Sequence, residues 1–325
     1  MDHGGARKSE MNLLDFSYSS NPYKPPFLGK ALKSAKIDRY PYCEEDLELK
    51  IKEKFKIKGE VSVAAGITEQ LYIIFNIFKH HRFVIPAYTY SEYERVANII
   101  GVKYRNIKVK DLTIDDLNIK REEVLLISNP NNPTGKYYDF IGDLVENSVY
   151  RNFYVVIDEA FIDFVGPKVK KIDINDNTII MRSFSKSYNI SGVRTGYSIA
   201  TDKFAKLIRN TRMPWGIGSL GCSLIEGIIR DKIFLNYSLA KIFSERERIM
   251  AKTGLKTDAN YFLAKVGNGT AVKNELRKKG ILVRDCTSFQ FPDSIRFSIR
   301  KIYENNRLLE ALDEFEVNQP DGINF

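Results

Sequence analysis

The chain has 325 residues, which is enough for one large domain and a second, smaller one. Its content of 43% hydrophobic and 28% charged residues is typical of a soluble protein. No apolar run approaches the roughly 18 residues that a membrane helix needs. The net charge is +9, and the basic residues are spread along the chain. The sequence contains no recognisable nucleic-acid-binding module. We therefore expect anionic small molecules as partners, and neither nucleic acid nor membrane.

The three cysteines, Cys43, Cys222 and Cys286, are widely spaced. This spacing predicts neither a disulfide framework nor a zinc site, and we expect no bound metal. The N-terminal residues are polar and contain no signal-peptide core. These observations predict a cytoplasmic protein.

Three regions differ in sequence pattern. Residues 1–43 are proline-rich around 21–26 and predict an extended arm that contributes to the smaller domain. Residues 44–220 alternate between predicted strands and helices, which indicates a mostly parallel sheet between helices. Residues 221–325 begin with a long helical stretch to about Met250 and continue as a smaller α+β domain. The expected fold class is therefore α/β, with a large domain and a small one.

In chain order, the alternating region predicts strands and helices in turn. Strands are expected over 61–65, 82–85, 102–107, 123–127, 153–157 and 177–181. Helices are expected over 44–56, from Thr68 to about Phe78, and over 91–100, 138–149 and 203–212. Ligands of such sheets bind beyond the carboxyl ends of the strands, so polar residues at those ends are candidates for a site.

One short stretch combines a lysine, two hydroxyls and an arginine. Ser183 and Ser185 stand three residues and one residue before Lys186, and Arg194 follows eight residues after it. Hydroxyls and a guanidinium can hold a phosphate, while a partly desolvated lysine can form a Schiff base with a carbonyl. The apolar run 178–181 predicts a buried strand that ends near this lysine. The alternative is an ordinary lysine on a basic surface.

The turn Gly66-Ile67-Thr68 is a second candidate, because it follows a predicted strand and precedes a predicted helix. We expect Thr68 to be the N-cap of that helix. Free N–H groups at a helix N-terminus favour anions, so the turn could bind phosphate. The alternative is a turn that binds nothing.

Asp158 follows the apolar strand 154–157, and a carboxylate there is costly unless it meets a cation. It could pair with a protonated ring nitrogen or form a structural salt bridge. Asn132 lies in a turn-rich loop and could donate to a phenolate oxygen or form an Asx turn. Together with Lys186, these are the protein groups that pyridoxal phosphate requires.

Four segments resemble the motifs of a known family in order and spacing. They are Asn131-Asn-Pro-Thr-Gly135, Asp158-Glu-Ala-Phe161, Ser183-Phe-Ser-Lys186 and Arg194. The family is that of the class I/II aminotransferase-fold enzymes with pyridoxal phosphate. The resemblance implies the aspartate-aminotransferase-like fold, with a mostly parallel seven-stranded sheet and a smaller α+β domain.

The same resemblance implies roles around pyridoxal 5′-phosphate. Lys186 would carry the cofactor and act in catalysis, Asp158 would pair with the ring nitrogen, and Asn132 would contact the ring hydroxyl. The implied phosphate site consists of Gly66, Ile67, Thr68, Ser183, Ser185 and Arg194.

Two aromatic positions also follow from the resemblance. Tyr93 resembles the aromatic residue that stacks on the cofactor ring, with Tyr88 and Tyr90 as alternatives because the loop carries extra residues. Tyr40 resembles the tyrosine that reaches the phosphate of the neighbouring subunit. This position implies a homodimer.

A closer resemblance covers nearly the whole chain and concerns two branches of the family. These are the histidinol-phosphate aminotransferases and the threonine-phosphate decarboxylases of cobalamin biosynthesis. The opening His3-Gly-Gly5, the phenylalanine Phe161 and the segment Met213-Pro-Trp215 resemble the decarboxylase branch. Ala6 and Gly218 depart from it, since asparagine is usual at both positions.

Arg284 and Arg296 match the arginines that hold the substrate anion, and Arg300 is a third candidate. Paired guanidinium groups suit a phosphate dianion. We also place His3 and Asn21 on the substrate side. A disordered N-terminus is the alternative for His3, and a surface charge is the alternative for Arg300.

The resemblance implies decarboxylation of L-threonine O-3-phosphate to (R)-1-amino-2-propanol O-2-phosphate. The alternative is a histidinol-phosphate aminotransferase or a related class I/II aminotransferase. A regulatory protein built on this fold would need an added DNA-binding domain, for which the sequence offers no segment.

Overall fold

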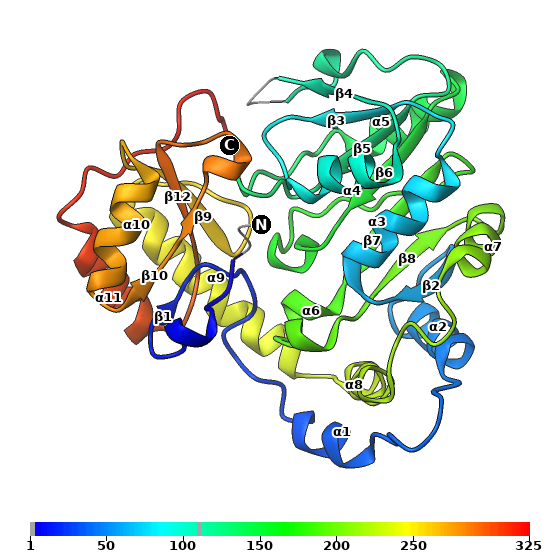
Figure 1. Cartoon of the computed structure of the whole chain (residues 1–325), viewed down its shortest axis with the longest axis horizontal. Helices are drawn as coiled ribbons and strands as arrows, with labels where there is room; N and C mark the ends of the chain where they lie inside the picture. Colours follow the sequence, from blue (N-terminus) through cyan, green and yellow to red (C-terminus); the bar gives the residue numbers. More distant parts are fainter. Residues whose placement is uncertain (1–3, 109–111) are drawn as a thin grey trace.

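The computed structural model describes residues 4–108 and 112–325, and Figure 1 shows two halves. The larger half is built on a seven-stranded sheet. Its order is β2 (Glu60–Ala64), β8 (Gly196–Ala200), β7 (Thr178–Ser183), β6 (Tyr154–Asp158), β5 (Val124–Ser128), β3 (Phe83–Pro86) and β4 (Tyr104–Ile107). Within this sheet β8 is antiparallel to both neighbours and the other pairs are parallel. The predicted α/β fold with its mostly parallel seven-stranded sheet is confirmed.

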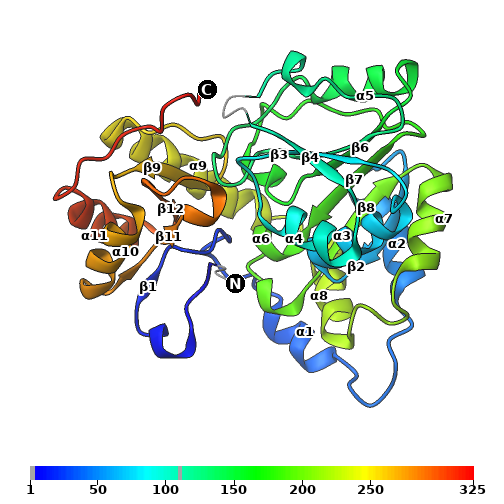
Figure 2. The ribbon, with the colours of Figure 1, turned by 45° about the horizontal axis from the view of Figure 1, so that its top comes forward.

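Helices cover both faces of this sheet (Figure 2). One face packs against α2 (Glu44–Lys54), α5 (Ile141–Tyr150) and α8 (Ser219–Arg230). The other face packs against α3 (Gly66–Ile77), α4 (Glu92–Ile100) and α7 (Asp202–Thr211). Central strands are therefore apolar without alternation, and all residues of β5 are buried.

The smaller half contains two short sheets. One has the order β11 (Arg284–Asp285), β12 (Ser294–Ser298), β9 (Tyr261–Lys265), and all its pairs are antiparallel. In the other, β1 (Leu14–Asp15) pairs in parallel with β10 (Ile281–Leu282). Helices α10 (Gly269–Lys278) and α11 (Ile302–Leu312) pack on these strands in a separate core.

The long helix α9 (Phe234–Thr253) connects the halves. Its first residue, Phe234, packs in the core of the larger half, whereas Ile242 and Ile249 pack in that of the smaller half. Helix α8 belongs entirely to the larger core through Leu224, Ile225 and Ile228. We therefore propose a domain boundary between α8 and α9, about ten residues after the predicted one.

The N-terminal arm contains more structure than the proline-rich sequence predicts. Its strand β1 joins the smaller half, and its helix α1 (Leu28–Ser34) packs on α8 of the larger half. Strand β8 was also not predicted. Both elements depend on contacts with distant segments, which local sequence patterns do not indicate.

The expectation that the cysteines form no disulfide was wrong. Cys43 and Cys222 form a disulfide bond between the start of α2 and the first turn of α8. The two residues are 179 positions apart, so only the packing of these helices reveals the pair. Cys286 is a buried free thiol.

Along the described residues, none of the helices combines the length and apolar character that crossing a membrane requires.

Candidate active site

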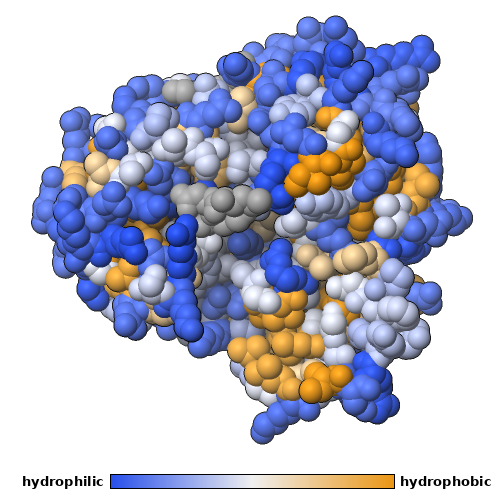
Figure 3. Space-filling model, in the orientation of Figure 1, coloured by the Kyte–Doolittle hydropathy of each residue, from blue (hydrophilic) through white to orange (hydrophobic). Residues whose placement is uncertain are grey.

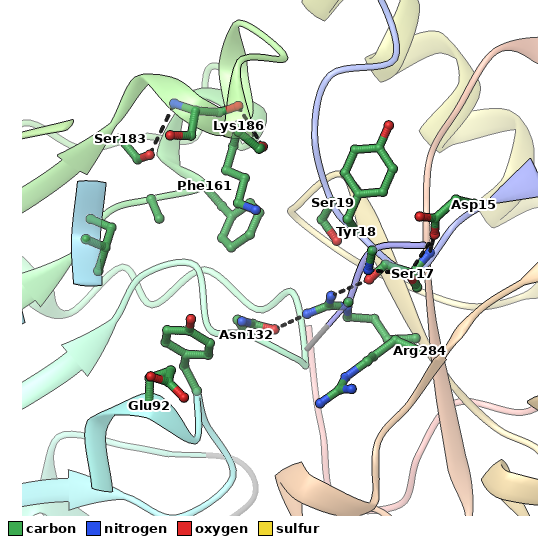
Figure 4. Close-up of a pocket in the computed structure, with 18 of the residues that line it drawn as sticks. Asp15, Ser17, Tyr18, Ser19, Glu92, Asn132, Phe161, Ser183, Lys186 and Arg284 are labelled. Carbon is green, nitrogen blue, oxygen red and sulfur yellow. Dashed lines mark hydrogen bonds between the residues drawn. The ribbon is translucent and has the colours of Figure 1, made fainter. Parts of the chain in front are cut away.

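A cavity of about 1000 Å³ lies between the two halves. Its walls come from the ends of the central strands, from β11 and β12, and from the N-terminal segment (Figure 4). It therefore has two ends of different origin. We call the wall on the large sheet the cofactor end, and the wall formed by residues 4–19 and 284–304 the substrate end.

The cofactor end is set by strand register. Asp158 is the last residue of β6 and pairs with Ser128 of β5 and Met181 of β7. Ser183 ends β7 and pairs with Gly196 at the start of antiparallel β8. Because these ends share one edge of the sheet, the side chains that follow them meet in the cavity.

Asp158 is held by two hydrogen bonds and is only 4% exposed. Its Oδ2 accepts from the Tyr93 hydroxyl at 2.6 Å, and its Oδ1 accepts from the Ala160 N–H at 2.9 Å. Burial raises the pKa of this carboxyl to about 6, although the bond from Tyr93 acts in the opposite direction. The carboxylate is thus oriented and poorly hydrated, which suits a cationic partner in the cavity.

Lys186 lies on the short helix α6 (Phe184–Ser187), whose N-cap Ser183 accepts from the Ser185 N–H at 3.2 Å. Burial, together with the positive charges of Arg296 and Arg194, lowers the pKa of its amine to about 8. The amine is therefore neutral often enough near neutral pH to attack a carbonyl.

The predicted phosphate site comes together around the start of α3. Gly66 has a φ of 79° and is close to Arg194, since a Cβ at Gly66 would lie 2.9 Å from the Arg194 Nη2. Thr68 lies inside the first turn of α3, whose N-cap is Ala65, so the prediction of Thr68 as the N-cap was wrong. The early N–H groups of this helix have no partner within it. With Ile67, Ser183 and Ser185 also lining the cavity, this end can hold an anion.

The three tyrosines considered for stacking on the cofactor ring have different surroundings. Tyr93 is fully buried and its hydroxyl is committed to Asp158, which makes it a poor candidate for stacking on a ring. Tyr90 lines the cavity and meets Tyr93 edge-on, with 5.5 Å between ring centroids. Tyr88 packs instead against Phe291 in a separate small core. Tyr90 and Tyr93 both line the cavity, and the hydrogen bond from Tyr93 to Asp158 favours Tyr90 as the residue predicted to cover a bound ring.

Asn132 links the two ends of the cavity. Its Oδ1 accepts a short hydrogen bond from Arg296 Nη1, which leaves the amide N–H₂ able to donate. Figure 4 shows this bond as a dashed line from Asn132. The Arg296 Nη2 donates to the Ser17 carbonyl at 3.1 Å, so one guanidinium joins both walls.

Two arginines converge at the substrate end. Arg284 and Arg296 are directly opposite each other on β11 and β12, and both are nearly buried. Their guanidinium carbons lie 5.4 and 5.8 Å from the ring centroid of Phe289. Arg296 also lies 5.1 Å from the ring centroid of Tyr261. Aromatic contacts thus fix the orientation of these guanidinium groups.

Arg300, the third candidate, is engaged with its own surroundings. It donates to the Asp15 carbonyl at 3.0 Å and to the Tyr18 hydroxyl at 3.4 Å, and it forms an ion pair with Glu304 at 3.0 Å. It lines the cavity, but much of its donor capacity is used.

The N-terminal segment closes the substrate end. The Gly5 N–H donates to the Ser17 Oγ at 2.7 Å, and the Ala6 N–H donates to the Asp15 Oδ2 at 2.6 Å. Gly4 approaches so closely that a Cβ there would lie 2.2 Å from the Ser17 carbonyl oxygen. His3 lies outside the described residues.

Two predicted site residues lie elsewhere. Asn21 is fully buried and does not line the cavity; its side chain donates to the Ser187 carbonyl at 2.8 Å and to the Ser238 Oγ at 2.7 Å. Its prediction as a substrate contact is therefore corrected to a structural role under α6. Tyr40 is 68% exposed and stacks on Trp215, outside the cavity of its own chain.

Sequence patterns missed Tyr18 and Ser19, which line the cavity and stand shortly before the Asn21-Pro22 pair. They come into the site because β1 pairs with β10, which lies 267 positions further along the chain. A polar run next to a proline is common in loops, so no local signal marks them.

Comparisons with known proteins show which family the chain resembles over most of its length. The family model described as "Aminotransferase class I and II" matches residues 15–312. The chain is 30% identical to a histidinol-phosphate aminotransferase of Pyrococcus furiosus, over 91% of this chain and 90% of that protein. It is 28% identical to a protein of Caldanaerobacter subterraneus that is provisionally named a threonine-phosphate decarboxylase, over 96% of this chain and 93% of that protein.

A solved histidinol-phosphate aminotransferase of Sinorhizobium meliloti, in complex with pyridoxal 5′-phosphate, has the same fold. The TM-score is 0.76 at 20% identity, with 92% of this chain and 89% of that chain covered.

Proposed function

Because the chain belongs to the aminotransferase class I and II family, we propose that it is a decarboxylase of L-threonine O-3-phosphate and forms (R)-1-amino-2-propanol O-2-phosphate. Family members use pyridoxal 5′-phosphate. The observation that carries the proposal is the convergence of Arg284 and Arg296 at the substrate end of a cavity that contains Lys186. Two adjacent guanidinium groups suit a phosphate dianion on a small amine.

The residues of the cofactor end fit pyridoxal phosphate. Lys186 would be the nucleophile for the carbonyl, Asp158 would pair with the ring nitrogen, and the amide N–H₂ of Asn132 would donate to the ring oxygen. Arg194 lies close to Gly66 and lines the cavity together with Thr68, Ser183 and Ser185, and these residues would hold the phosphate. When bound, the cofactor supplies an electron sink for the substrate's α-carbon.

The reaction then depends on how the substrate is held. Arg284 and Arg296 bind its phosphate, which leaves the carboxylate to be oriented by other groups. The bond between the α-carbon and the carboxyl carbon breaks, CO₂ leaves, and the electron pair stays at the α-carbon. Asp158 would stabilise the positive charge of the protonated ring nitrogen. Lys186 Nζ would return a proton to the α-carbon.

Two features support decarboxylation over amino transfer. The ring centroid of Phe161 lies 5.9 Å from Lys186 Nζ. This phenylalanine resembles the decarboxylase branch, whereas most aminotransferases have tyrosine at the corresponding position. Gly4 and Gly5, which belong to the decarboxylase-like opening His3-Gly-Gly5, line the cavity.

Histidinol-phosphate aminotransferase is the second candidate, and the 30% identity to the Pyrococcus furiosus protein favours it. Its substrate has the same phosphate but no carboxylate. Such an aminotransferase would use Lys186 to remove a proton from the α-carbon of this substrate.

A paired assay tests the proposal. We expect CO₂ release from threonine phosphate without a keto acid. Activity confined to histidinol phosphate with 2-oxoglutarate would overturn the proposal in favour of the aminotransferase.

We further propose a homodimer in which Tyr40 reaches the cofactor phosphate of the partner subunit. Tyr40 and Tyr42 are 68% and 86% exposed and both contact Trp215. Figure 3 shows apolar side chains gathered near α1, where Leu32 and Ile37 are 54% and 92% exposed. An apolar surface of this kind is typical of an interface.

Mixing two inactive variants, Lys186→Ala and Tyr40→Ala, tests the dimer. Subunit exchange should restore activity, because one site of each mixed dimer then contains both native residues. No restoration after verified exchange would contradict the shared site.

A further inference from the structure

Ser19 carries a buried hydroxyl that no other described residue binds. The side chain is 1% exposed, its Oγ has no hydrogen-bond partner, and it lines the cavity. A buried hydroxyl without a partner destabilises the protein, because it has lost its hydrogen bonds to water. Because Ser19 lines the active-site cavity, a ligand bound there is a candidate partner for this hydroxyl.

Two hydrogen bonds fix the position of Ser19. Two residues before it, the Ser17 carbonyl accepts from Arg296 at 3.1 Å. Two residues after it, the Asn21 N–H donates to the Lys186 carbonyl at 2.8 Å. Because neighbouring Cα atoms are about 3.8 Å apart, the Cα of Ser19 lies within about 8 Å of both anchored residues. Ser19 thus lies between the anion-binding arginine and the helix of the lysine, and Figure 4 shows it across the cavity from Lys186.

We propose that the Ser19 Oγ–H donates a hydrogen bond to the α-carboxylate of the amino-acid substrate. This assignment rests on the proposed function and adds a specificity residue to it. The guanidinium groups of Arg284 and Arg296 converge near Phe289 and suit the phosphate dianion. Ser19 offers one neutral donor on the side of Lys186, where the substituents of the α-carbon lie.

A neutral partner suits a carboxylate that leaves as CO₂. The carboxylate loses its negative charge as the bond to the α-carbon breaks. A guanidinium would therefore bind the starting carboxylate more strongly than the transition state, which slows the reaction. A hydroxyl orients the same group with less of this penalty.

The test uses the Ser19→Ala variant of the cofactor-loaded enzyme. Three amines are compared by the concentration that half-saturates the rapid absorbance change of the bound cofactor. O-Phospho-L-threonine has a phosphate and a carboxylate, 1-amino-2-propanol O-2-phosphate has only the phosphate, and L-threonine has only the carboxylate. We expect the binding of the two amines that carry a carboxylate to weaken about tenfold or more, as for loss of a hydrogen bond to a charged group. Binding of the aminopropanol phosphate should weaken less than twofold.

Equal weakening of all three amines, or no weakening of any, would overturn the assignment. Ser62→Ala is the matched control, because Ser62 is also 1% exposed and its Oγ has no partner, but it lies on β2 away from the cavity. Ser19→Cys, which keeps the size of the side chain and has a weak donor, should resemble Ser19→Ala.

The titration is independent of the reaction that follows binding. If CO₂ release fails while Ser19→Ala still weakens only the carboxylates, the proposed reaction is wrong and the carboxylate contact stands. If CO₂ is released but the variant binds all amines like the native enzyme, the contact is wrong and the reaction stands.

Discussion

The cofactor end of the cavity comes from one sheet, whereas the substrate end comes from segments far apart in the chain. Asp158 and Ser183 end adjacent parallel strands, so strand register alone brings them together. Arg296 and Ser17 meet through a hydrogen bond across 279 positions of sequence. The first arrangement is stable as part of a buried sheet, and the second depends on docking of the N-terminal segment. Variants at the two ends should therefore fail in different ways.

The largest effect is expected at the cofactor end. Lys186→Ala removes the amine that carries the cofactor and returns the proton, so turnover should fall by at least about 10³-fold. The absorbance of the lysine-bound cofactor should disappear with it. The exposed Lys206→Ala on α7 is the control and should behave like the native enzyme. Turnover at the native rate in Lys186→Ala would refute the assignment of this end.

The substrate end should respond through binding. Arg296→Lys keeps the charge but loses the planar guanidinium, so KM for threonine phosphate should rise about 10- to 100-fold. The cofactor absorbance should be retained, which distinguishes this variant from Lys186→Ala. Arg277→Lys, at a half-exposed arginine paired with Glu10, serves as the control. Loss of cofactor binding in Arg296→Lys would show that the two ends are not separable.

A smaller effect is expected for Tyr93→Phe, which removes the hydrogen bond to Asp158 Oδ2. That bond lowers the pKa of Asp158, so the pKa should rise further above its ordinary value when it is lost. We expect about a tenfold loss of turnover, and the decline in activity on the acidic side should move to higher pH. Tyr104→Phe, on the edge strand β4, is the control. An unchanged pH profile would show that Tyr93 does not position Asp158.

The smallest effect concerns pH. Burial lowers the pKa of Lys186 to about 8, and only the neutral amine reacts with the cofactor carbonyl. The rate at which cofactor-free enzyme takes up pyridoxal phosphate should therefore rise about tenfold from pH 7 to pH 9 and then level off. A stopped-flow absorbance measurement checks this, and a rate that still rises steeply above pH 9 would indicate an ordinary lysine.

The sequence predicts the cofactor end better than the substrate end for a physical reason. Asp158 stands directly after one apolar run and Lys186 stands five residues after another. The strand character of both runs is local, and parallel strands place their ends together. Ser19 and Tyr18 have no such signal, because their position depends on the pairing of β1 with β10. Asn21 shows the opposite error: a polar residue near site residues is used to fix helix α6 rather than to bind a ligand.

The aromatic residues show the same limit. The sequence offers Tyr88, Tyr90 and Tyr93 within six positions, and only packing separates their roles. The Cys43–Cys222 disulfide was missed because helix packing brings together residues 179 positions apart.

A single turnover in D₂O tests decarboxylation most directly. The cofactor-loaded enzyme is mixed with threonine phosphate labelled with ¹³C in the carboxyl group, without a keto acid. We expect one ¹³CO₂ for each aminopropanol phosphate, one deuterium at the carbon that carried the carboxyl group, and recovery of the original cofactor absorbance. Formation of a keto acid that retains the ¹³C, with lasting loss of that absorbance, would identify amino transfer and contradict the proposed function.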